Sequence, residues 1–441
     1  MKWGRAVKTI LMTLLLGAMD EVIPLFAQAQ TEALIFTQRG AAPILLTAPH
    51  AGSEDVPRVT QVRACGTTSP DAWTKDVTEM VASRLQEALG RGPYVVMARF
   101  HRKWIDANRA EDTVCDAADE DGVSYTDPDA RSHYRAYHAG IRGFVDEIRQ
   151  KWPRGGVLVD IHGHSRDGQL NVVHRGTRDG RTVTRLTAAY GAGALIGPAS
   201  IFGRLQSAGY TVYPANTPPG NPRETLNGGY TVAAYGSHNA DGIDAIQVEI
   251  GRDLRDDVSS RRRFSRDLAD AIVAFSREYL GVSPPEDCVS YNPGNLRVVS
   301  AGSQGYRIAD GSHWLFLVDS REDAERLLAI AKRHTKTCFI GRGNGRQDRS
   351  RYVAHYFKGD SGIRATIGRE DCLAYLPNAL QIREEGKRWL LTDGRSRMLV
   401  LDDRDDAEPA LHVARQHRSH CFVGRDNKRP NRGDYIVQYW Q

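Results

Sequence analysis

Four short clusters of polar residues contain the groups that could do chemistry. They are residues 49–54 (PHAGSE), 106–109 (DANR), 160–164 (DIHGH) and 247–250 (QVEI), and each follows or ends an apolar run that is typical of a strand. Side chains at the carboxyl ends of neighbouring parallel strands converge in one crevice. The four clusters could therefore share one site, and their histidines, carboxylates and arginine suit a zinc hydrolase.

The expected metal ligands are two histidines and a glutamate. Catalytic zinc takes imidazole nitrogens and carboxylate oxygens from the protein and leaves one position open. His50 and His162 each leave a strand, and Glu54 is near enough to His50 to reach the same ion if the loop turns back. We expect one Zn²⁺ ion at His50, Glu54 and His162. Taken alone, His50 and Glu54 are more often an ordinary surface pair.

Asp160 and His164 flank His162 at positions that share one face of a strand. Asp160 is the natural acceptor that orients an imidazole next to a metal. His164 has three interpretations: a substitute ligand, a substrate contact, or a solvated loop histidine. The segment 163–165 does not follow the GxSxG pattern of a nucleophilic serine.

Glu249 and Arg109 are the candidate catalytic and substrate-binding groups. Glu249 lies in the apolar run 243–250, where a lone acid is costly unless it is paired or at the end of the strand. As general acid/base it would take a proton from the attacking water and deliver it to the leaving amine. The planar fork of Arg109 matches a substrate carboxylate. The alternative is an internal salt bridge, for example between Glu249 and Arg252.

Strands alternate with helices through the front of the chain. We expect strands at 43–47, 94–100 and 156–160, and helices at 71–89, capped by Asp71 and ended by Gly90, and at 134–152. This alternation predicts an α/β fold with a mostly parallel or mixed twisted sheet that helices cover.

The first residues are typical of an export signal. Three basic residues precede the apolar run 10–16, and Ala27-Gln28-Ala29 is a small-x-small cleavage site. A signal peptide over residues 1–29 predicts a secreted or periplasmic protein. No membrane span is expected, because spanning a bilayer takes ~20 apolar residues. The alternative is an uncleaved amphipathic or anchoring terminus.

Six cysteines fall into three pairs separated by 50, 50 and 49 residues: Cys65/Cys115, Cys288/Cys338 and Cys372/Cys421. In an oxidising compartment this predicts three disulfides. The last two pairs occupy equivalent places in an internal repeat, so that pairing within each repeat is the simplest choice. The alternatives are free buried thiols or metal binding, and the absence of a CxxC spacing disfavours the latter.

The last third of the chain is a duplication. The landmarks CxxYxP, DG, DA and CFxGR recur with an offset of 84 residues, slipping to 83. We expect a catalytic domain at 30–284, a linker near 283–285, and two small α+β repeats at 285–367 and 368–441. Each repeat would be marginal alone, and its disulfide would add ~2 to 4 kcal/mol. The repeated aromatic and Gly-Arg landmarks could bind a glycan or cell-wall ligand, although packing is the simpler explanation.

The net charge of +5 is dispersed along the 441 residues. Arginines alternate with acidic residues, and no basic tract with interleaved aromatics is present in the sequence. Nucleic acid is therefore not an expected partner.

Six motifs in this order resemble the N-formylglutamate amidohydrolase family, over about residues 40–260. They are residues 49–52, 102–109, 134–138, 160–162, 227–231 and 247–250. The family belongs to the zinc-carboxypeptidase-like and aspartoacylase-like fold. The resemblance implies His50, Glu54 and His162 as zinc ligands and Glu249 as acid/base. It also implies Asn108 with Arg109 as the carboxylate clamp, and a turn containing Gly229 and Tyr230 that shapes the substrate pocket.

We expect an exported zinc-dependent hydrolase of an amide bond. Its substrate would be a small molecule or peptide with a carboxylate: an N-acyl-amino acid, a glutamyl peptide or a cell-wall peptide. Deformylation of N-formylglutamate itself belongs to intracellular histidine breakdown, which conflicts with export. The alternatives are an extracytoplasmic glycan- or wall-binding protein whose front domain is a degenerate scaffold, and metal-independent serine hydrolysis through Ser165.

Overall fold

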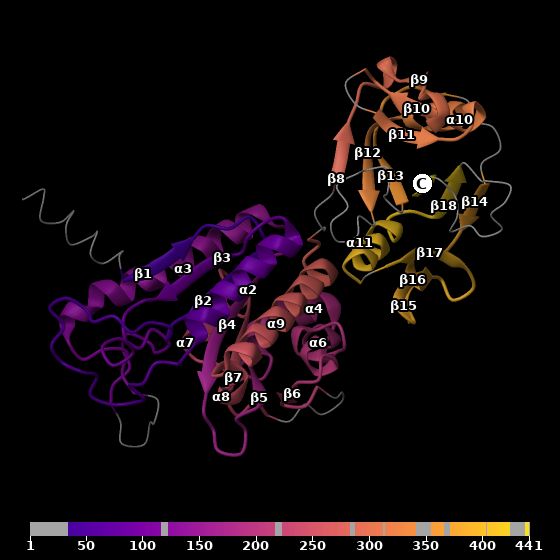
Figure 1. Cartoon of the computed structure of the whole chain (residues 1–441). Coiled ribbons are helices and arrows are strands. Elements are labelled where there is room, and N and C mark those ends of the chain that lie inside the picture. Colours follow the sequence, from indigo (N-terminus) through magenta and orange to yellow (C-terminus); the bar gives the residue numbers. More distant parts are fainter. Residues whose placement is uncertain are drawn as a thin grey trace, which may run out of the picture. The chain divides into compact units, whose positions relative to one another are not determined.

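The computed structural model describes nine stretches of the chain. They are residues 34–115, 122–216, 223–282, 287–311, 314–340, 354–365, 371–402, 404–423 and 437–440. The chain divides into two compact units, Met1–Pro284 and Pro285–Gln441 (Figure 1). The predicted signal peptide and the predicted linker at 283–285 lie outside the described residues.

The front unit is built on a twisted sheet of seven strands in the order β1-β3-β2-β4-β7-β5-β6. The four strands β3, β2, β4 and β7 run parallel, whereas β1 and β5 are antiparallel to their neighbours β3 and β7. The expected mixed α/β sheet is confirmed. The strands are β1 (Ile35–Gln38), β2 (Ile44–Ala48), β3 (Tyr94–Ala98), β4 (Val157–His164), β5 (Val172–Gly176), β6 (Thr211–Tyr213) and β7 (Asp244–Gly251).

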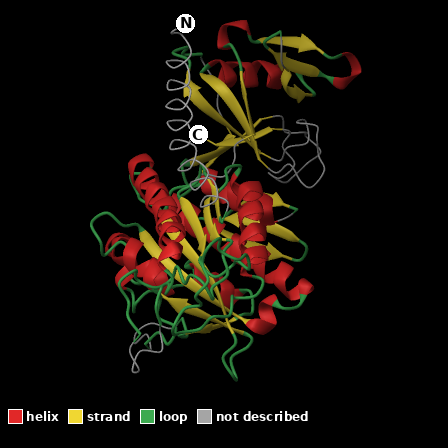
Figure 2. Cartoon of the chain, turned by 90° about the vertical axis from the view of Figure 1, so that its left-hand side faces the viewer, coloured by secondary structure: helices red, strands yellow, loops and turns green. Residues whose placement is uncertain are grey.

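Helices cover both faces of this sheet, because alternate residues of the buried strands are apolar on each side (Figure 2). Leu46 and Val159 pack with the face of α2 and α9, and Leu45 and Leu158 pack with α3 and α7. The helices are α2 (Thr74–Leu89), α3 (Arg131–Lys151), α4 (Thr184–Tyr190), α5 (Gly193–Ile196), α6 (Ile201–Ser207), α7 (Tyr230–Tyr235), α8 (Arg252–Arg255) and α9 (Val258–Tyr279).

The structure corrects the predicted start of α2. Gly90 ends this helix in a left-handed conformation, as predicted. The residue before the first turn is Trp73, with φ 68°, and no side chain caps the helix. The prediction that Asp71 caps α2 is therefore wrong, and its carboxylate turns toward two histidines instead.

No single helix among the described residues is long and apolar enough to cross a bilayer. Within the same residues, one bent pair, Arg181–Tyr190 with Gly193–Ser207, meets the criteria by length and composition only.

The second unit has a six-stranded sheet in the order β14-β18-β19-β13-β12-β8, and two further sheets, β11-β10-β9 and β15-β16-β17. Its helices are α10 (Arg321–Lys332) and α11 (Arg404–Ala414). The first repeat contributes β8 (Asp287–Ser290), β9 (Arg297–Ser300), β10 (Tyr306–Ala309), β11 (Trp314–Val318), β12 (His334–Ile340) and β13 (Ala354–Asp360). The second contributes β14 (Asp371–Ala374), β15 (Gln381–Glu385), β16 (Arg388–Thr392), β17 (Arg397–Leu401), β18 (Ser419–Val423) and β19 (Val437–Trp440).

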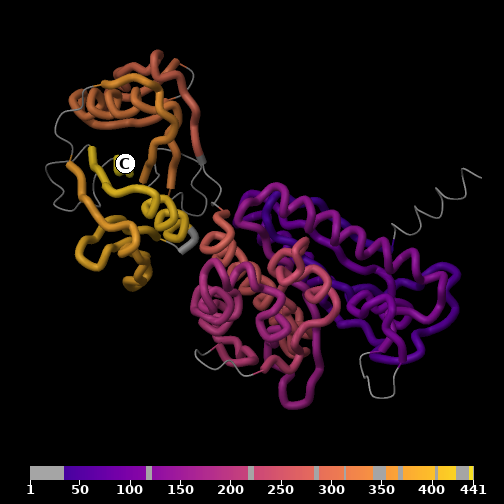
Figure 3. Tube along the Cα trace, turned by 180° about the vertical axis from the view of Figure 1, so that it is seen from behind, coloured from indigo at the N-terminus to yellow at the C-terminus, as the bar shows by residue number. Residues whose placement is uncertain are grey.

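The two repeats share one intertwined core. Their equivalent strands β13 and β19 run parallel at the centre of the sheet, and the strand order is the same read from either side. Two repeats related in this way place their helices on opposite faces (Figure 3). The core under α10 therefore contains Val437 and Tyr439 of the second repeat, and the core under α11 contains Ala354 and Tyr356 of the first.

All three predicted disulfides are present: Cys65–Cys115, Cys288–Cys338 and Cys372–Cys421. In each repeat the bridge joins residues that face each other on two paired strands, β8 with β12 and β14 with β18. The Gly-Arg landmarks at 341–342 and 424–425 lie outside the described residues.

The shared core predicts that neither repeat folds alone. We expect residues 285–441 to unfold in one cooperative transition and residues 285–367 to remain unfolded, because the latter lack the strands that complete the core under α10. Circular dichroism and thermal unfolding of the two fragments test this. A cooperative transition of the shorter fragment would contradict it.

An ion-pair network at the surface of α3 makes the stability of the front unit depend on pH. Glu147 accepts hydrogen bonds from Arg39 (3.1 Å), Lys151 and the Tyr94 hydroxyl (2.6 Å). These partners, Arg39 foremost, lower the pKa of Glu147 from 4.5 to about 2. The stabilisation is complete above the ordinary pKa and is lost as the pH falls toward 2.

We therefore expect Glu147→Gln to flatten the dependence of the melting temperature on pH between about pH 5 and pH 3. Calorimetry at several pH values measures this. Glu79→Gln, at an exposed residue 4.0 Å from Lys75, is the control and should keep the wild-type slope. Equal slopes for Glu147→Gln and the wild type would contradict the prediction.

Candidate metal centre and active site

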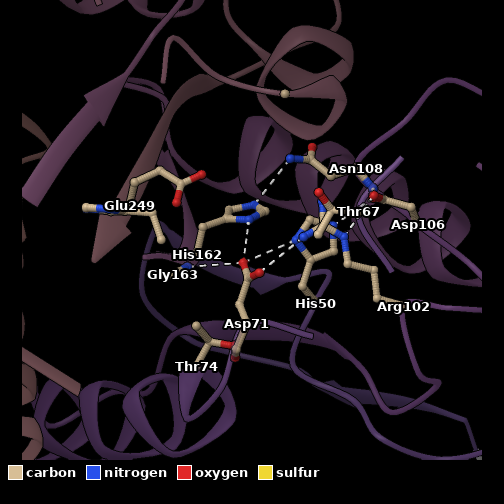
Figure 4. A network of polar contacts seen from close by, with 12 residues as sticks. His50, Thr67, Asp71, Thr74, Arg102, Asp106, Asn108, His162, Gly163 and Glu249 are labelled. Atoms are coloured by element: carbon tan, nitrogen blue, oxygen red, sulfur yellow. Dashed lines mark hydrogen bonds and ion pairs between the residues drawn. The ribbon is translucent and has the colours of Figure 1, made fainter. Parts of the chain in front are cut away.

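Three elements bring together a group of metal-ligating side chains. His50 follows β2, Asp71 precedes α2, and His162 lies near the carboxyl end of β4. One ligand atom from each of the three residues lies within 4.8 Å of the others (Figure 4). Because β2 and β4 are parallel neighbours, both histidines emerge at the same edge of the sheet.

Asp71 lies at the centre of this group. Its Oδ2 atom is 3.2 Å from Nδ1 of His50 and 3.2 Å from Nδ1 of His162. The backbone N–H of Gly163 donates to the same oxygen (3.1 Å), and Arg102 donates to Oδ1 (3.2 Å). The backbone of Gly163 and the buried Arg102 thus fix the Asp71 carboxylate between the two imidazole rings.

The far nitrogen of each ring contacts a second carboxylate. Nε2 of His50 is 2.7 Å from Oδ1 of Asp106, and Nε2 of His162 is 2.9 Å from Oδ2 of Asp160. An imidazole that donates from Nε2 keeps its lone pair on Nδ1. Asp106 and Asp160 therefore hold both rings in the tautomer that presents a lone pair toward Asp71.

Further contacts fix these two outer carboxylates. Asp106 accepts from Arg63 (3.1 Å) and from Nε of Arg102 (3.0 Å). Asp160 accepts from the Thr47 hydroxyl (2.6 Å). Both carboxylates are fully buried, so that neither can turn away without leaving a donor unpaired.

The electrostatics favour a positive charge among the three inner residues. Burial raises the pKa of Asp71, but His50 and His162 outweigh it, and the pKa is well below its usual value. Burial lowers the pKa of His162, but Asp160 and Asp71 outweigh it, and the pKa is well above its usual value. Two imidazole nitrogens and a carboxylate oxygen are a donor set of catalytic zinc. The residues at this site fit such an ion.

Glu54 does not join the histidines. Its side chain is exposed, its backbone N–H donates to Arg99 O (2.8 Å), and its own carbonyl accepts from His101 (2.8 Å). At Gly52 the loop passes very close to Arg99. A Cβ atom on Gly52 would come within 2.1 Å of the Arg99 backbone. The loop therefore runs beside the residues that follow β3 instead of turning back, and Asp71, not Glu54, lies with the two histidines.

Glu249 lies beside His162 on the neighbouring strand (Figure 4). The side chain is half-buried, and Gln247 donates to its Oε1 atom (2.9 Å). Burial raises the pKa of this carboxyl, and the attraction of His162 opposes the rise. A half-buried carboxylate next to the proposed ligands is where a general acid/base has to be. Arg252, the alternative partner, is instead near Asp256 (3.7 Å).

Asn108 joins the expected pocket turn to the strands. Its Oδ1 accepts from the backbone of Thr231 (2.8 Å), and its Nδ2 donates to Gln247 (3.4 Å) and lies 3.3 Å from Nε2 of His162. A Cβ atom on Gly229 would come within 2.1 Å of the Asn108 amide, so that only glycine allows this approach. The backbone N–H of Tyr230 donates to Asn108 O (3.2 Å).

Arg109 and His164 have different surroundings. The Arg109 side chain is half-buried, and its guanidinium donates to the Asn108 carbonyl (2.9 Å). The Tyr134 hydroxyl donates to the Arg109 carbonyl (2.7 Å). His164 is buried and contacts Val172 O through Nε2 (2.9 Å). The structure thus places His164 against β5 and outside the metal-ligating group.

Two important residues were missed from the sequence. Asp71 was interpreted as a helix cap, although an acid just before the helix that follows β2 already lies at the correct edge of the sheet. Arg255 of α8 is buried and donates to His164 O (3.1 Å), to Ile250 O (3.1 Å) and to Ala72 O (2.5 Å). These hydrogen bonds connect β4, β7 and the residues before α2. No sequence pattern distinguishes Arg255 from the other arginines of this region.

Residues 42–255 match the N-formylglutamate amidohydrolase family. The match confirms the resemblance that the six motifs indicated. No curated protein matches the chain.

Several solved structures resemble part of the chain. An N-formylglutamate amidohydrolase from Ralstonia eutropha JMP134 is 18% identical, with 56% of this chain and 98% of that chain covered and a TM-score of 0.41. A bacteriophage poly-gamma-glutamate hydrolase is 15% identical, covering 56% and 90%, with a TM-score of 0.27. An N-acetylmuramoyl-L-alanine amidase from Clostridium difficile 630 is 13% identical, covering 54% and 97%, with a TM-score of 0.25.

The donor set predicts which acid binds the metal. We expect Asp71→Ala to abolish stoichiometric zinc binding and Asp106→Asn to weaken it by about 10- to 100-fold, since the latter removes only the partner of His50 Nε2. Elemental analysis and titration of the metal-stripped protein measure the affinity. Glu54→Gln is the control and should bind zinc normally. Loss of zinc in Glu54→Gln, with normal binding in Asp71→Ala, would restore the prediction made from the sequence.

Proposed function

We propose that the chain is an exported zinc-dependent hydrolase of an amide bond in a substrate that bears a carboxylate. N-acyl-amino acids, glutamyl peptides and cell-wall peptides are the substrate classes. The observation that carries this proposal is the buried group of His50, Asp71 and His162 with Glu249 on the adjacent strand. The family match over residues 42–255 supports amide hydrolysis independently.

A zinc ion held by His50, Asp71 and His162 would supply Lewis-acid polarisation of the substrate carbonyl and acidify the attacking water. Glu249 accepts the proton of that water at its carboxylate and later delivers it to the leaving nitrogen. Burial raises the pKa of Glu249 toward neutral pH. This direction favours both proton transfers, from the water and to the leaving nitrogen. Gln247, which donates to Oε1, orients the carboxylate for them.

Arg109 binds the substrate carboxylate in this proposal. Arg109 follows Asp106 and Asn108 in the same loop. Asp106 is hydrogen-bonded to His50, and Asn108 is hydrogen-bonded to the start of α7. A planar fork at such a fixed position can hold a carboxylate by two hydrogen bonds. This contact would align the scissile amide with Glu249.

Three disulfides support export, because such bonds persist in oxidising compartments. The second unit would then bind a glycan or cell-wall ligand. Trp314 supports this role: it is exposed, and the Arg307 guanidinium lies 5.5 Å from its ring centroid. The alternative of a degenerate front scaffold is disfavoured by the donor set and by the three fixed carboxylates of Asp71, Asp106 and Asp160.

The proposal predicts the effect of removing the general acid/base. Glu249→Gln keeps the shape of the side chain and is expected to lower kcat by about 10²- to 10⁴-fold while zinc remains bound. Kinetics on N-acyl-glutamates, glutamyl peptides and wall fragments, with and without a chelator, measure this. Glu54→Gln is the matched control at an exposed glutamate and should keep full activity.

Two outcomes would reject the proposal. One is wild-type activity in Glu249→Gln on every substrate that the protein hydrolyses. The other is hydrolysis that survives complete removal of zinc and disappears in Ser165→Ala, which would establish serine hydrolysis instead.

A further inference from the structure

The two repeats of the second unit contain equivalent three-stranded sheets with the same register. In the first repeat, Ala309 of β10 pairs with Arg297 of β9 and with Trp314 of β11. The counterparts of these residues in β15, β16 and β17 pair in the same way. Each position of the first sheet therefore has a counterpart in the second, and the side chains at the two positions can be compared directly.

The first of these sheets has one covered face and one open face. Ile308 and Phe316 lie in the core under α10. Arg307 and Val299 are register partners on the opposite face, because neighbouring side chains along a strand alternate. The Arg307 guanidinium lies 5.5 Å from the ring centroid of Trp314, which places this ring on the open face too. Val299 is 49% exposed and Trp314 is 42% exposed, so that both side chains reach the solvent.

The open face of the first repeat has positive charge that no acid on the sheet balances. It includes Arg297 and Arg307, and β9, β10 and β11 contain no acidic residue. Arg307 donates to the neutral side chain of Gln304 (3.0 Å). Within the residues that the structure describes, neither arginine forms an ion pair. The guanidinium groups therefore keep donors that match an anionic ligand.

The second repeat neutralises the equivalent face with an acid of its own. Glu385 of β15 accepts hydrogen bonds from Arg383 (2.6 Å) and from Arg397 (2.5 Å). Arg397 is the counterpart of Trp314, and Ala301 of the first repeat is the counterpart of Glu385. The two sheets have the same backbone pairing, so that the difference lies in the side chains. One repeat closes its face with ion pairs, and the other leaves an indole ring and two cations for a ligand.

The open face matches the chemistry of a sugar ring that carries a carboxylate. The backbone groups within a sheet are already paired, so that only side chains can bind a ligand on its face. The apolar C–H face of a pyranose ring packs flat on an exposed indole, and the hydroxyl groups of the sugar stay in water. A guanidinium next to that ring can hold a carboxylate by two hydrogen bonds. An extended peptide binds instead at the edge of a sheet, through its main chain.

We propose that the open face of β9, β10 and β11 binds a glycan whose sugar rings bear carboxylates. Trp314 stacks on a sugar ring, and Arg297 and Arg307 bind the carboxylate. The second repeat completes the shared core and does not bind the glycan at its equivalent face. This inference rests on the proposed binding of a glycan by the second unit, and it specifies the repeat and the chemistry of the ligand.

Two peptide-free tetrasaccharides separate the contribution of the ring from that of the charge. One alternates N-acetylglucosamine with N-acetylmuramic acid, and the other contains N-acetylglucosamine alone and has no carboxylate. In calorimetric titrations of the full chain we expect the acidic glycan to bind more tightly, with an advantage that shrinks as salt is added. Trp314→Ala should weaken the binding of both by about 5- to 30-fold. Arg297→Gln and Arg307→Gln should each weaken only the acidic glycan, by about 3- to 10-fold.

The duplication supplies matched controls for these variants. Arg397→Gln changes the counterpart of Trp314 in the second repeat and should leave both affinities as in the wild type. Ala301→Glu introduces the acid of the second repeat into the first and should abolish the preference for the acidic glycan. Ala301→Gln, which has the same size without the charge, should keep this preference. Circular dichroism verifies that each variant is folded.

Three results would overturn the inference. Equal binding of the two tetrasaccharides by the wild type overturns it and leaves the proposed glycan-binding role in place. Tighter binding of tetra-L-glutamate than of the acidic tetrasaccharide, lost in Trp314→Ala, would make the face a peptide site. Binding of neither tetrasaccharide overturns the inference together with the glycan-binding role. Amide hydrolysis by the front unit is measured separately, and its failure would affect none of these results.

Discussion

The Asp71 carboxylate between two imidazole rings is the contact on which the front unit depends. One oxygen faces both Nδ1 atoms at 3.2 Å, and the other accepts from Arg102. Two lone pairs and a carboxylate pointed at one another repel unless positive charge lies among them, so that this geometry is stable only with a proton or a metal ion there. The burial of all three residues in a region of low dielectric strengthens the requirement.

The outer contacts explain why the rings cannot relax. Asp106 and Asp160 each accept from one imidazole, and arginine or threonine side chains fix them in turn. Arg102 connects the inner and outer layers, because it donates to both Asp71 and Asp106. A substitution in this network therefore acts on the metal-binding residues even where it is far from any substrate.

The sequence predicted those parts of the site that regular structure positions. His162, Asp160 and Glu249 lie in strands, where a period of two and the parallel order of neighbours settle which side chains meet. Asp71 was not predicted, because the path of the loop after His50 depends on the close approach of Gly52 to β3, which no local pattern encodes. The shared core of the repeats was missed for a related reason. Sequence similarity shows that two repeats are alike, but not whether their strands pair within or between them.

The strand order of the second unit also affects when it can fold. Its central pair joins β13 to β19, the last strand that the structure describes, and about 80 residues separate the two along the chain. Contacts between such distant segments form late, because the loop entropy must be overcome before they contribute any stability. A ribosome would release nearly the whole unit before its core could close. The unit therefore acquires its compact form only after its last strands have been synthesised.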